Sequence, residues 1–165
     1  MATATPLLKQ MALSKRKYFV YNVKFVCGLQ KNKFENDCEG AIVSRGIYNT
    51  EINILNYGPK EVTVVKAFTP VVVQNKAIAR EPETQGPAGV DRVVLKPFHA
   101  TMDDCCKIVK MLEKVKADEQ LKIGFVEIIS PVQIEVVAVY TVTDLEQNNP
   151  NINVVQVEPR SLSIG

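Results

Sequence analysis

The sequence predicts an all-β fold with one inserted helix at about residues 101–117, arranged as a two-sheet antiparallel β-sandwich of the jelly-roll kind. Valine and isoleucine together number 36 in the 165 residues, against 10 leucines. β-branched side chains lose rotamer freedom in a helix and pack well on a pleated sheet, so this ratio disfavours an all-helical protein. Short alternating apolar stretches separated by turn residues are typical of a sandwich or jelly roll.

Eight segments carry the strand pattern. In the first, every second residue from Phe19 to Cys27 is apolar, while Asn22 and Lys24 face the other way. Pro70 separates the third segment from the fourth, and Ser130-Pro131 forms the corner between the sixth and the seventh. The predicted strands are residues 19–27, 48–54, 61–68, 71–79, 90–96, 123–129, 132–142 and 152–157.

The single helix is predicted from a change of period after residue 100. Thr101 and Asp104 have the spacing of a capping box, with Asp in place of Glu, and acidic residues fill the first turn. Apolar residues then recur at helical spacing, and lysines gather towards the C-terminal end. These apolar residues are Cys105, Ile108, Val109, Leu112 and Val115. We expect about four turns, covering an open end or face of the sandwich.

The chain is expected to hold one domain with two extensions. Residues 1–17 form an N-terminal arm, residues 18–160 the single sandwich domain, and residues 161–165 a C-terminal tail. In the arm, the basic triplet Lys15-Arg16-Lys17 follows the apolar residues, whereas a secretory signal places its positive charge first. We therefore expect cytoplasmic synthesis without a classical signal peptide, and a final location that stays open. The apolar residues of the arm are Leu7, Leu8, Met11 and Leu13.

Charge and composition exclude several classes of partner. The formal net charge is +2, from 20 basic and 18 acidic residues, and this gives no reason to expect nucleic acid or an anionic membrane surface. No run of 18 or more apolar residues is present, so we expect no membrane span. Phosphate-binding glycine loops are absent from the sequence, and we expect no cofactor.

Four cysteines leave three interpretations open. They are buried reduced thiols, or a disulfide within or between subunits, or a metal or reactive site. Cys27 and Cys105 are expected to be buried, because each lies on the apolar phase of its element. Cys105, Cys106 and the single histidine, His99, are the parts of a possible thiol site, although the neighbouring carboxylates oppose a thiolate. No pair of cysteines has chelate spacing, so no metal site is expected.

A polar and aromatic surface is a candidate site for a sugar-like ligand. It comprises the stretch Tyr48-Asn49-Thr50-Glu51 together with Asn53, Asn56 and Tyr57. Sugar recognition relies on aromatic stacking and planar polar groups, and aromatic residues make up only 7% of this chain.

Three parts of the sequence resemble known proteins. Residues 45–54 read Arg-Gly-Ile-Tyr-Asn-Thr-Glu-Ile-Asn-Ile, and residues 124–131 read Gly-Phe-Val-Glu-Ile-Ile-Ser-Pro. With residues 136–141 and 157–160, they resemble a family of small uncharacterised bacterial proteins, which implies no activity. The pattern Ile128-x-Ser130-x-Val132-x-Ile134-x-Val136 is similar to the penultimate hairpin of the soluble, oligomeric β-sandwich transducers that pair with microbial sensory rhodopsins. The inserted helix and the arm depart from that transducer pattern.

The last five residues carry the third resemblance. Ser161-Leu162-Ser163-Ile164-Gly165 is similar to the Leu-x-Ile/Val-Gly core of peptides that dock cargo into bacterial encapsulin shells. Such tails normally continue past the glycine and follow a flexible linker.

These observations favour a non-enzymatic β-sandwich that associates with itself, as a building block of a larger bacterial assembly or surface structure. Catalytic constellations are missing, both ends carry apolar extensions, and antiparallel sandwiches leave edge strands that accept a strand from a neighbour. The alternative is a small oligomeric ligand-binding or signalling module for a sugar-like or protein partner. An encapsulin-type cargo protein and a thiol enzyme are lower alternatives.

Overall fold

The computed structural model describes residues 17–32, 42–112, 118–146 and 149–163. Expectations for the arm residues Leu7, Leu8, Met11 and Leu13, and those for Cys38 and Val115, lie outside the described residues. The described elements are β1 (Lys17–Gln30), β2 (Gly46–Leu55), β3 (Val62–Val73), β4 (Lys76–Ala77), β5 (Gly89–Leu95), β6 (Ala100–Asp104), α2 (Cys105–Met111), β7 (Lys122–Ser130), β8 (Glu135–Thr143), β9 (Pro150–Gln156) and β10 (Arg160–Ser163).

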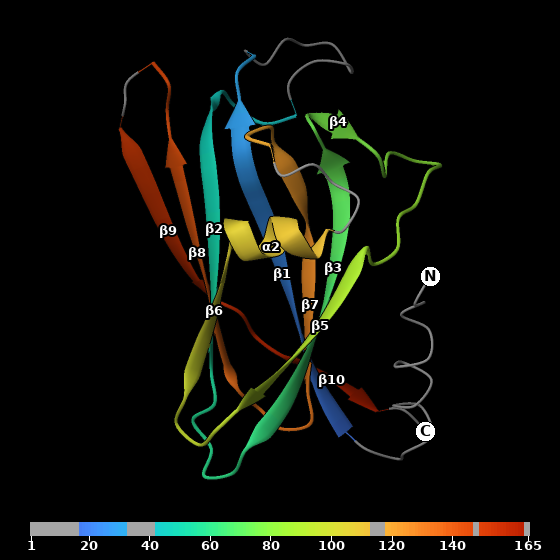
Figure 1. The fold of residues 1–165 in the computed structure, drawn as a ribbon, viewed down its shortest axis with the longest axis vertical. Coiled ribbons are helices and arrows are strands. Elements are labelled where there is room, and N and C mark those ends of the chain that lie inside the picture. The colour runs from blue at the N-terminus through green and yellow to red at the C-terminus, as the bar shows by residue number, and fades with distance from the viewer. Residues whose placement is uncertain (1–16, 33–41, 113–117, 147–148, 164–165) are drawn as a thin grey trace.

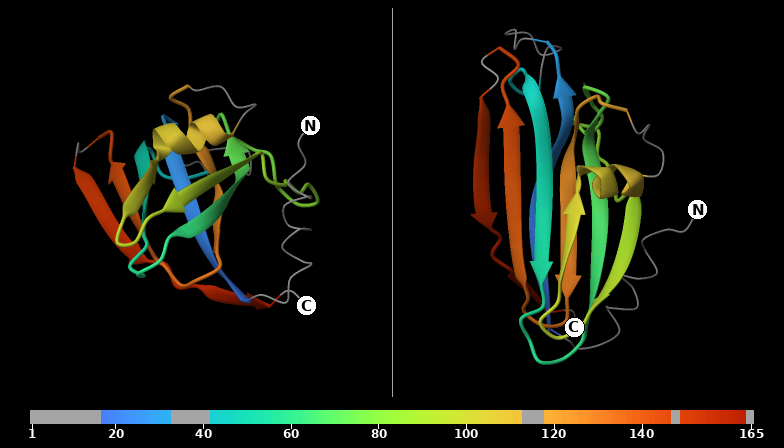
Figure 2. Two further views of the ribbon diagram at one scale, coloured as in Figure 1. Left: turned by 60° about the horizontal axis from the view of Figure 1, so that its bottom comes forward. Right: turned by 60° about the vertical axis from the view of Figure 1, so that its left-hand side comes forward.

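The described strands join into one large antiparallel sheet (Figure 1). Its order is β4-β3-β7-β1-β2-β8-β9, with β10 on β1, β5 on β3 and β6 on β2. The sheet curves strongly (Figure 2), and α2 lies across β1 and contacts it (Figure 1). The predicted mostly-β class with a single helix is confirmed for the described residues. Because hydrogen bonds link all ten described strands into one sheet, the division into a two-sheet sandwich or jelly roll stays a prediction.

β1 holds the two halves of the sheet together by changing partners along its length. It pairs with β7 up to Cys27, which lies opposite Lys122, and with β2 from Gly28, which lies opposite Tyr48. The change occurs at a residue with φ of 107°, a conformation that favours glycine. A Cβ atom on Gly28 would meet the backbone carbonyl of Gln120. The long first strand therefore needs glycine at the point where it changes partners.

The core lies on the apolar phase that the sequence predicts for β1, β2 and β8. Tyr21, Val23 and Phe25 are buried, whereas Asn22 and Lys24 of the same strand are exposed. The hydroxyl of Tyr21 donates to the carbonyl of Ile134 at 2.8 Å, and burial raises its pKa. The main cluster is Tyr21, Val23, Phe25, Cys27, Ile52, Ile54, Val62, Val64, Phe68, Leu95, Ile108, Leu112, Val126, Ile128, Ile134, Val136 and Ala138.

The predicted helix begins later than expected. Residues 101–104 belong to β6, which pairs with β2, so the capping box at Thr101 is wrong. Asp104 is the N-cap instead, and its side chain accepts from the backbone N–H of Lys107 at 2.8 Å. The helix runs from Cys105 to Met111, and residues 113–117 lie outside the described residues. A short polar or acidic side chain can accept from the free N–H groups of a first helical turn wherever a helix begins. Residue type alone therefore placed the start of this helix too early.

Two further segments differ from the sequence prediction. Pro70 does not end a strand, because β3 continues through it and shifts register between Pro70 and Val72. An irregularity of this kind tolerates the missing N–H of proline. Residues 161–163, expected to be a tail, form most of β10 and pair with the first residues of β1.

Candidate association edge and cysteine cavity

β9 lies at one end of the sheet order, and among the described strands it pairs with β8 alone (Figures 1 and 2). All seven of its residues are exposed. Ile152 is 64% exposed, Val154 62% and Val155 38%, so apolar side chains are uncovered on both faces of the strand. Removing this apolar surface from water would be favourable, and it requires another molecule or another segment to cover the strand.

The hydrogen bonds of β9 show which backbone groups reach the open edge. The backbone N–H of Val157 donates to the carbonyl of Val136 at 2.9 Å, in the same register as the β8–β9 pairs. In an antiparallel pair, hydrogen-bonded residues alternate with residues that turn their backbone groups away. Ile152, Val154 and Gln156 are therefore the residues whose N–H and C=O groups point away from β8.

β9 lacks the usual protection of a sheet edge. Edge strands in soluble proteins are commonly blunted by charged side chains, proline or a bulge. Residues 150–156 contain no charged side chain, and the register with β8 runs through all seven pairs without a shift. Pro150 is the single protecting feature, and it stands at the first position of the strand. The remaining edge is open to another strand.

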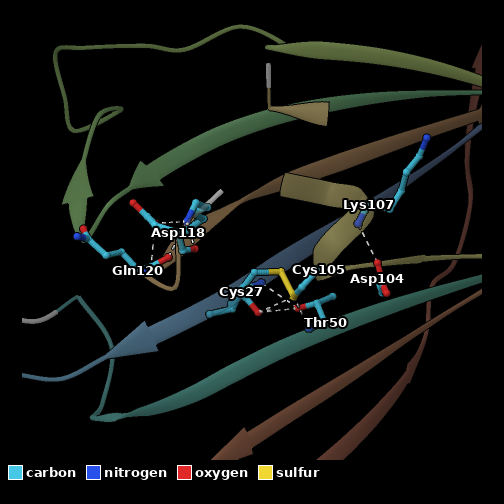
Figure 3. The surroundings of a disulfide bond; sticks show 9 residues. Cys27, Thr50, Asp104, Cys105, Lys107, Asp118 and Gln120 are labelled. Carbon is cyan, nitrogen blue, oxygen red and sulfur yellow. Dashed lines mark hydrogen bonds and ion pairs between the residues drawn. A yellow bond between two sulfur atoms is a disulfide. The ribbon is translucent and has the colours of Figure 1, made fainter. Parts of the chain in front are cut away.

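The three described cysteines gather at a second site, where α2 meets β1. Cys27 of β1 and Cys105 of α2 form a disulfide with their Cα atoms 5.6 Å apart, across a sequence separation of 78 residues (Figure 3). Of the three open interpretations, the disulfide within one chain is the one that the structure contains. Cys27 is buried at 2% exposure, as predicted, whereas Cys105 is only partly buried and packs against the core.

A cavity of about 320 Å³ opens beside this disulfide. Cys106, an exposed free cysteine, shares the cavity with both disulfide-bonded residues. Lys110 lies one helical turn after Cys106, so the two side chains share a face of α2. The lining residues are Cys27, Gly28, Asn49, Cys105, Cys106, Val109, Lys110, Asp118, Gln120 and Lys122.

Thr50 of β2 fixes the backbone around the disulfide (Figure 3). Its hydroxyl accepts from the N–H of Val26 at 2.9 Å and donates to the carbonyl of the same residue at 3.0 Å. Its own backbone N–H lies 3.1 Å from Sγ of Cys105. Since Val26 precedes Cys27, one buried threonine holds both partners of the disulfide in place.

Lys122, an almost fully buried lysine, is one of the residues that line the cavity. Nζ of Lys122 donates to Oδ1 of Asp118 at 2.7 Å and to the carbonyls of Asp118 and Gln120, each at 2.9 Å. All three ammonium hydrogens therefore have acceptors. Hydrogen bonds from Lys122 and then from Gln74 lower the pKa of Asp118 from 3.8 to about 2.

A four-residue charge cluster ties β6 and α2 to the sheet. Nζ of Lys66 lies 2.8 Å from both carboxylate oxygens of Asp103 and 3.2 Å from Asp91, which Lys107 approaches to 2.9 Å. Burial alone would raise the pKa of Asp91, but the hydrogen bonds from Lys107 and Lys66 outweigh it and lower the pKa. The two positive and two negative charges neutralise each other, so we interpret the cluster as a structural contact.

His99 does not join the cysteines. Its Nδ1 lies 2.8 Å from the carbonyl of Pro97, and the residue stands just before β6, while Cys105 follows that strand. The five residues of β6 span roughly 16 Å at about 3.3 Å per residue. The structure therefore brings together Cys105 and Cys106 of the predicted thiol site and leaves out its histidine.

The predicted sugar-like surface is divided. Asn56 is buried, and its amide donates to the carbonyls of Lys60, Leu95 and Lys96, so it is a structural residue. Tyr48 instead lines a separate cavity of about 430 Å³. The other lining residues are Ser44, Arg45, Val142, Asp144, Asn149, Pro150 and Asn151.

Among the described residues, no group of three or more His, Cys, Asp or Glu side chains is arranged to hold a metal ion. The described part of the chain also contains no helix long and apolar enough to cross a membrane.

Comparisons with known proteins give no family. No family model matches the chain, and no curated protein matches it. Among solved structures, the "Crystal Structure of Thermotoga maritima 1070" matches over 87% of this chain and 94% of that chain, with 10% sequence identity and a TM-score of 0.42. This is a distant likeness to one protein, and the family resemblances of the sequence stay predictions.

Sequence reasoning missed the two features that define these sites. The open edge at β9 depends on strand order, which the alternation within one strand does not encode. The partner of Cys105 lies 78 residues away, and four cysteines allow several pairings. A signal for the pairing was present, because Cys27 and Cys105 both lie on the inward phase of their elements.

Proposed function

We propose that this protein is a non-enzymatic building block that associates with itself by pairing β9 of one copy with β9 of another. The observation that carries the proposal is the exposure of all seven residues of β9 at the open end of the sheet. Adding a strand there would satisfy the backbone groups of Ile152, Val154 and Gln156 and cover apolar side chains on both faces.

A second copy is the occupant that best fits the chemistry of this edge. Residues 150–156 are uncharged, so two copies meet without like-charge repulsion. In an antiparallel two-fold pair centred on Val154, Ile152 lies opposite Gln156 of the partner subunit, and every outward N–H of the strand finds an acceptor. Moving the centre to Asn153 would place Pro150, which has no N–H, in the ladder. The centre at Val154 therefore pairs only residues that have both an N–H and a C=O group to offer.

The finer architecture that we propose is a two-layer sandwich, with β9 as the outer strand of one layer. Support comes from the main core cluster, which contains inward residues of β7 such as Ile128 and of β8 such as Val136. A non-enzymatic role is favoured because the histidine of the predicted thiol site lies away from the cysteines, as described above.

The test is the size of the particle in wild type and in Val154→Lys, measured by analytical ultracentrifugation over a range of concentrations. We expect a discrete oligomer or larger particle for the wild type. We expect dissociation for the variant, because two lysines would meet across the two-fold axis. A wild type that stays monomeric would overturn the proposed function.

Val94→Lys is the matched control. Val94 is a 51% exposed valine in β5, comparable with the 62% of Val154, and it lies in a strand far from β9 in the sheet order. It receives the same charge, so its particle should keep the wild-type size. If both lysine variants dissociate, general charge repulsion and not edge pairing explains the result.

A second candidate is a module for a sugar-like ligand, favoured by the cavity at Tyr48. An aromatic ring, an arginine and two asparagines line about 430 Å³, which is within the range of small-molecule pockets. Screening of immobilised glycans with wild type and Tyr48→Ala tests it. Binding that Tyr48→Ala removes and Val154→Lys leaves unchanged, by a protein that forms only a small oligomer, would favour this module over the building block.

A further inference from the structure

Three sulfur-bearing residues at one cavity carry an inference that is independent of self-association. Cys27 and Cys105 are joined in a disulfide, Cys106 is a free thiol, and all three line the same space of about 320 Å³. Their accessibility is graded: Cys27 is 2% exposed, Cys105 is partly buried and Cys106 is exposed. A small reagent that enters the cavity meets Cys106 first and Cys27 last.

Cys106 is unsuited to a disulfide with its neighbour while α2 is intact. The Cα atoms of consecutive residues are about 3.8 Å apart, below the 4.4–6.8 Å that is usual for disulfides. Cys27 and Cys105, at 5.6 Å, are within that range. The fold thus separates a stable pair from a third thiol that stays free beside it.

We propose that Cys27, Cys105 and Cys106 form a thiol–disulfide exchange centre, in which Cys106 is the entry thiol for a low-molecular-weight disulfide. The centre closes and opens the link between β1 and α2. Its ligand is the oxidised or reduced form of a small, negatively charged thiol.

Closure of the link runs in three exchange steps. In the first, the thiolate of Cys106 attacks a small disulfide RSSR, a Cys106–S–S–R bond forms, and RS⁻ leaves and takes up a proton. In the second, the thiolate of Cys105 attacks the sulfur of R, and Cys106 leaves as a thiolate. In the third, the thiolate of Cys27 attacks Sγ of Cys105, the Cys27–Cys105 bond forms, and a second RS⁻ leaves.

The sum of these steps balances. One RSSR is reduced to two RSH, the dithiol Cys27/Cys105 is oxidised to the disulfide, and Cys106 is regenerated. Opening is the reverse sequence and consumes two RSH. Closure needs no oxidant other than the small disulfide, and opening needs no reductant other than the small thiol.

Lys110 gives the cavity its preference for a negatively charged thiol. It stands one turn after Cys106 on the same face of α2, about 5–6 Å away between Cβ atoms. The second lysine of the cavity, Lys122, already donates to three oxygens. A carboxylate on a molecule bonded to Cys106 therefore lies within reach of the Lys110 ammonium, which acts as a positioning group.

Besides the link, α2 is held to the sheet by the contact of Lys107 with Asp91 and by two buried apolar side chains. Ile108 is the one residue within the helix that is fully buried, and Leu112 is buried at its C-cap. We therefore expect the opened form to keep the β-sheet and to lose protection of the α2 backbone from hydrogen exchange.

The experiment follows re-formation of the Cys27–Cys105 disulfide in full-length protein that has been reduced and desalted without oxygen. Oxidised glutathione is the probe, and samples are quenched by alkylation and read by peptide mass spectrometry. The wild type should show glutathione first on Cys106 and then the internal disulfide. Cys106→Ser should form the disulfide about tenfold more slowly, because buried thiols meet the reagent less often.

Two controls separate this role from a structural one. Cys38→Ser should match the wild type, and the final ratio of disulfide to dithiol should be the same in Cys106→Ser as in the wild type. Lys110→Ala should slow the reaction with oxidised glutathione and leave that with neutral hydroxyethyl disulfide unchanged. Closure at the wild-type rate in Cys106→Ser, glutathione carried first by Cys38, or no disulfide in any variant would overturn the proposal.

Discussion

Lys66 and Asp103 pair two opposite charges inside the protein: Nζ lies 2.8 Å from each carboxylate oxygen, and both side chains are 2% exposed. The lysine comes from β3 and the aspartate from β6, 37 residues later in the chain. A buried ion pair is costly to desolvate, and it repays that cost only when both partners are present. The pair therefore fixes where β6 meets the rest of the sheet.

Removing one partner should cost much more than removing both. Lys66→Met leaves Asp103 buried without its cation, and we expect a loss of about 3–5 kcal/mol in the free energy of unfolding. The double variant Lys66→Met/Asp103→Leu should recover most of this loss. Urea unfolding measures both values.

The control for this pair is the exposed one between Lys31 and Glu119, whose side chains are 68% and 73% exposed. Lys31→Met should change stability by less than about 1 kcal/mol, because exposed pairs are screened by water. A loss in Lys66→Met as small as that in Lys31→Met would show that the inner pair is not desolvated in solution.

The pairing of Lys66 was foreseeable in part from the sequence. The series Val62, Val64, Lys66 and Phe68 has period two, so a strand that buries its valines also buries the lysine. A buried lysine needs an acidic partner, but alternation along one strand does not say which of 18 acidic residues supplies it.

The lack of information about distant partners also explains which elements the sequence predicted correctly. β1 and β8 alternate regularly over nine residues or more, and their inward phases were predicted correctly. β6 was taken for the start of a helix, because Thr101 and Asp104 have the spacing of a capping box. Local residue type can suggest a cap, whereas the pairing of β6 with β2 depends on contacts 45 to 53 residues apart. The open edge at β9 and the Cys27–Cys105 link depend on the same kind of distant contact.

Acid should weaken the fold through Asp118. Its pKa in the folded protein is lowered from 3.8 to about 2, so its ionised form is stabilised by folding. That contribution is complete above the ordinary value and is lost as the pH falls from about 4 to about 2. Asp118→Asn should flatten the dependence of the urea midpoint on pH in this window. An unchanged slope would mean that Asp118 does not hold its contact with Lys122 in solution.

Gly28 should tolerate no side chain. Its φ is 107°, and an added Cβ would meet the carbonyl of Gln120. Gly28→Ala should therefore lose about 1–3 kcal/mol or more in the free energy of unfolding, since strain and a clash combine. Gly86→Ala is the matched control, because nothing lies within 4 Å of a Cβ built there. Equal melting temperatures for the two variants would contradict the change of partner along β1 that the structure places at Gly28.

The N-terminal arm lies outside the described residues, except for Lys17, which begins β1. Ordering each arm residue costs about 1–2 kcal/mol, and each of the arm's four large apolar side chains returns roughly 1.5–3 kcal/mol when it is buried. Within one subunit the core is already filled, so burial of the arm there would recover little of the ordering cost. A neighbouring copy offers uncovered apolar surface, such as that of β9. We expect deletion of residues 1–16 to shrink the particle while the circular dichroism keeps its β signal.

Comparison with Val154→Lys then assigns the contact. If the deletion and Val154→Lys both dissociate the particle, the arm and the β9 edge act together in one interface. If the deletion alone does so, the arm carries the association and the pairing of two β9 strands is wrong. An unchanged particle after the deletion would contradict the role of the arm, because Leu7, Leu8, Met11 and Leu13 would then contribute nothing to the contact between copies.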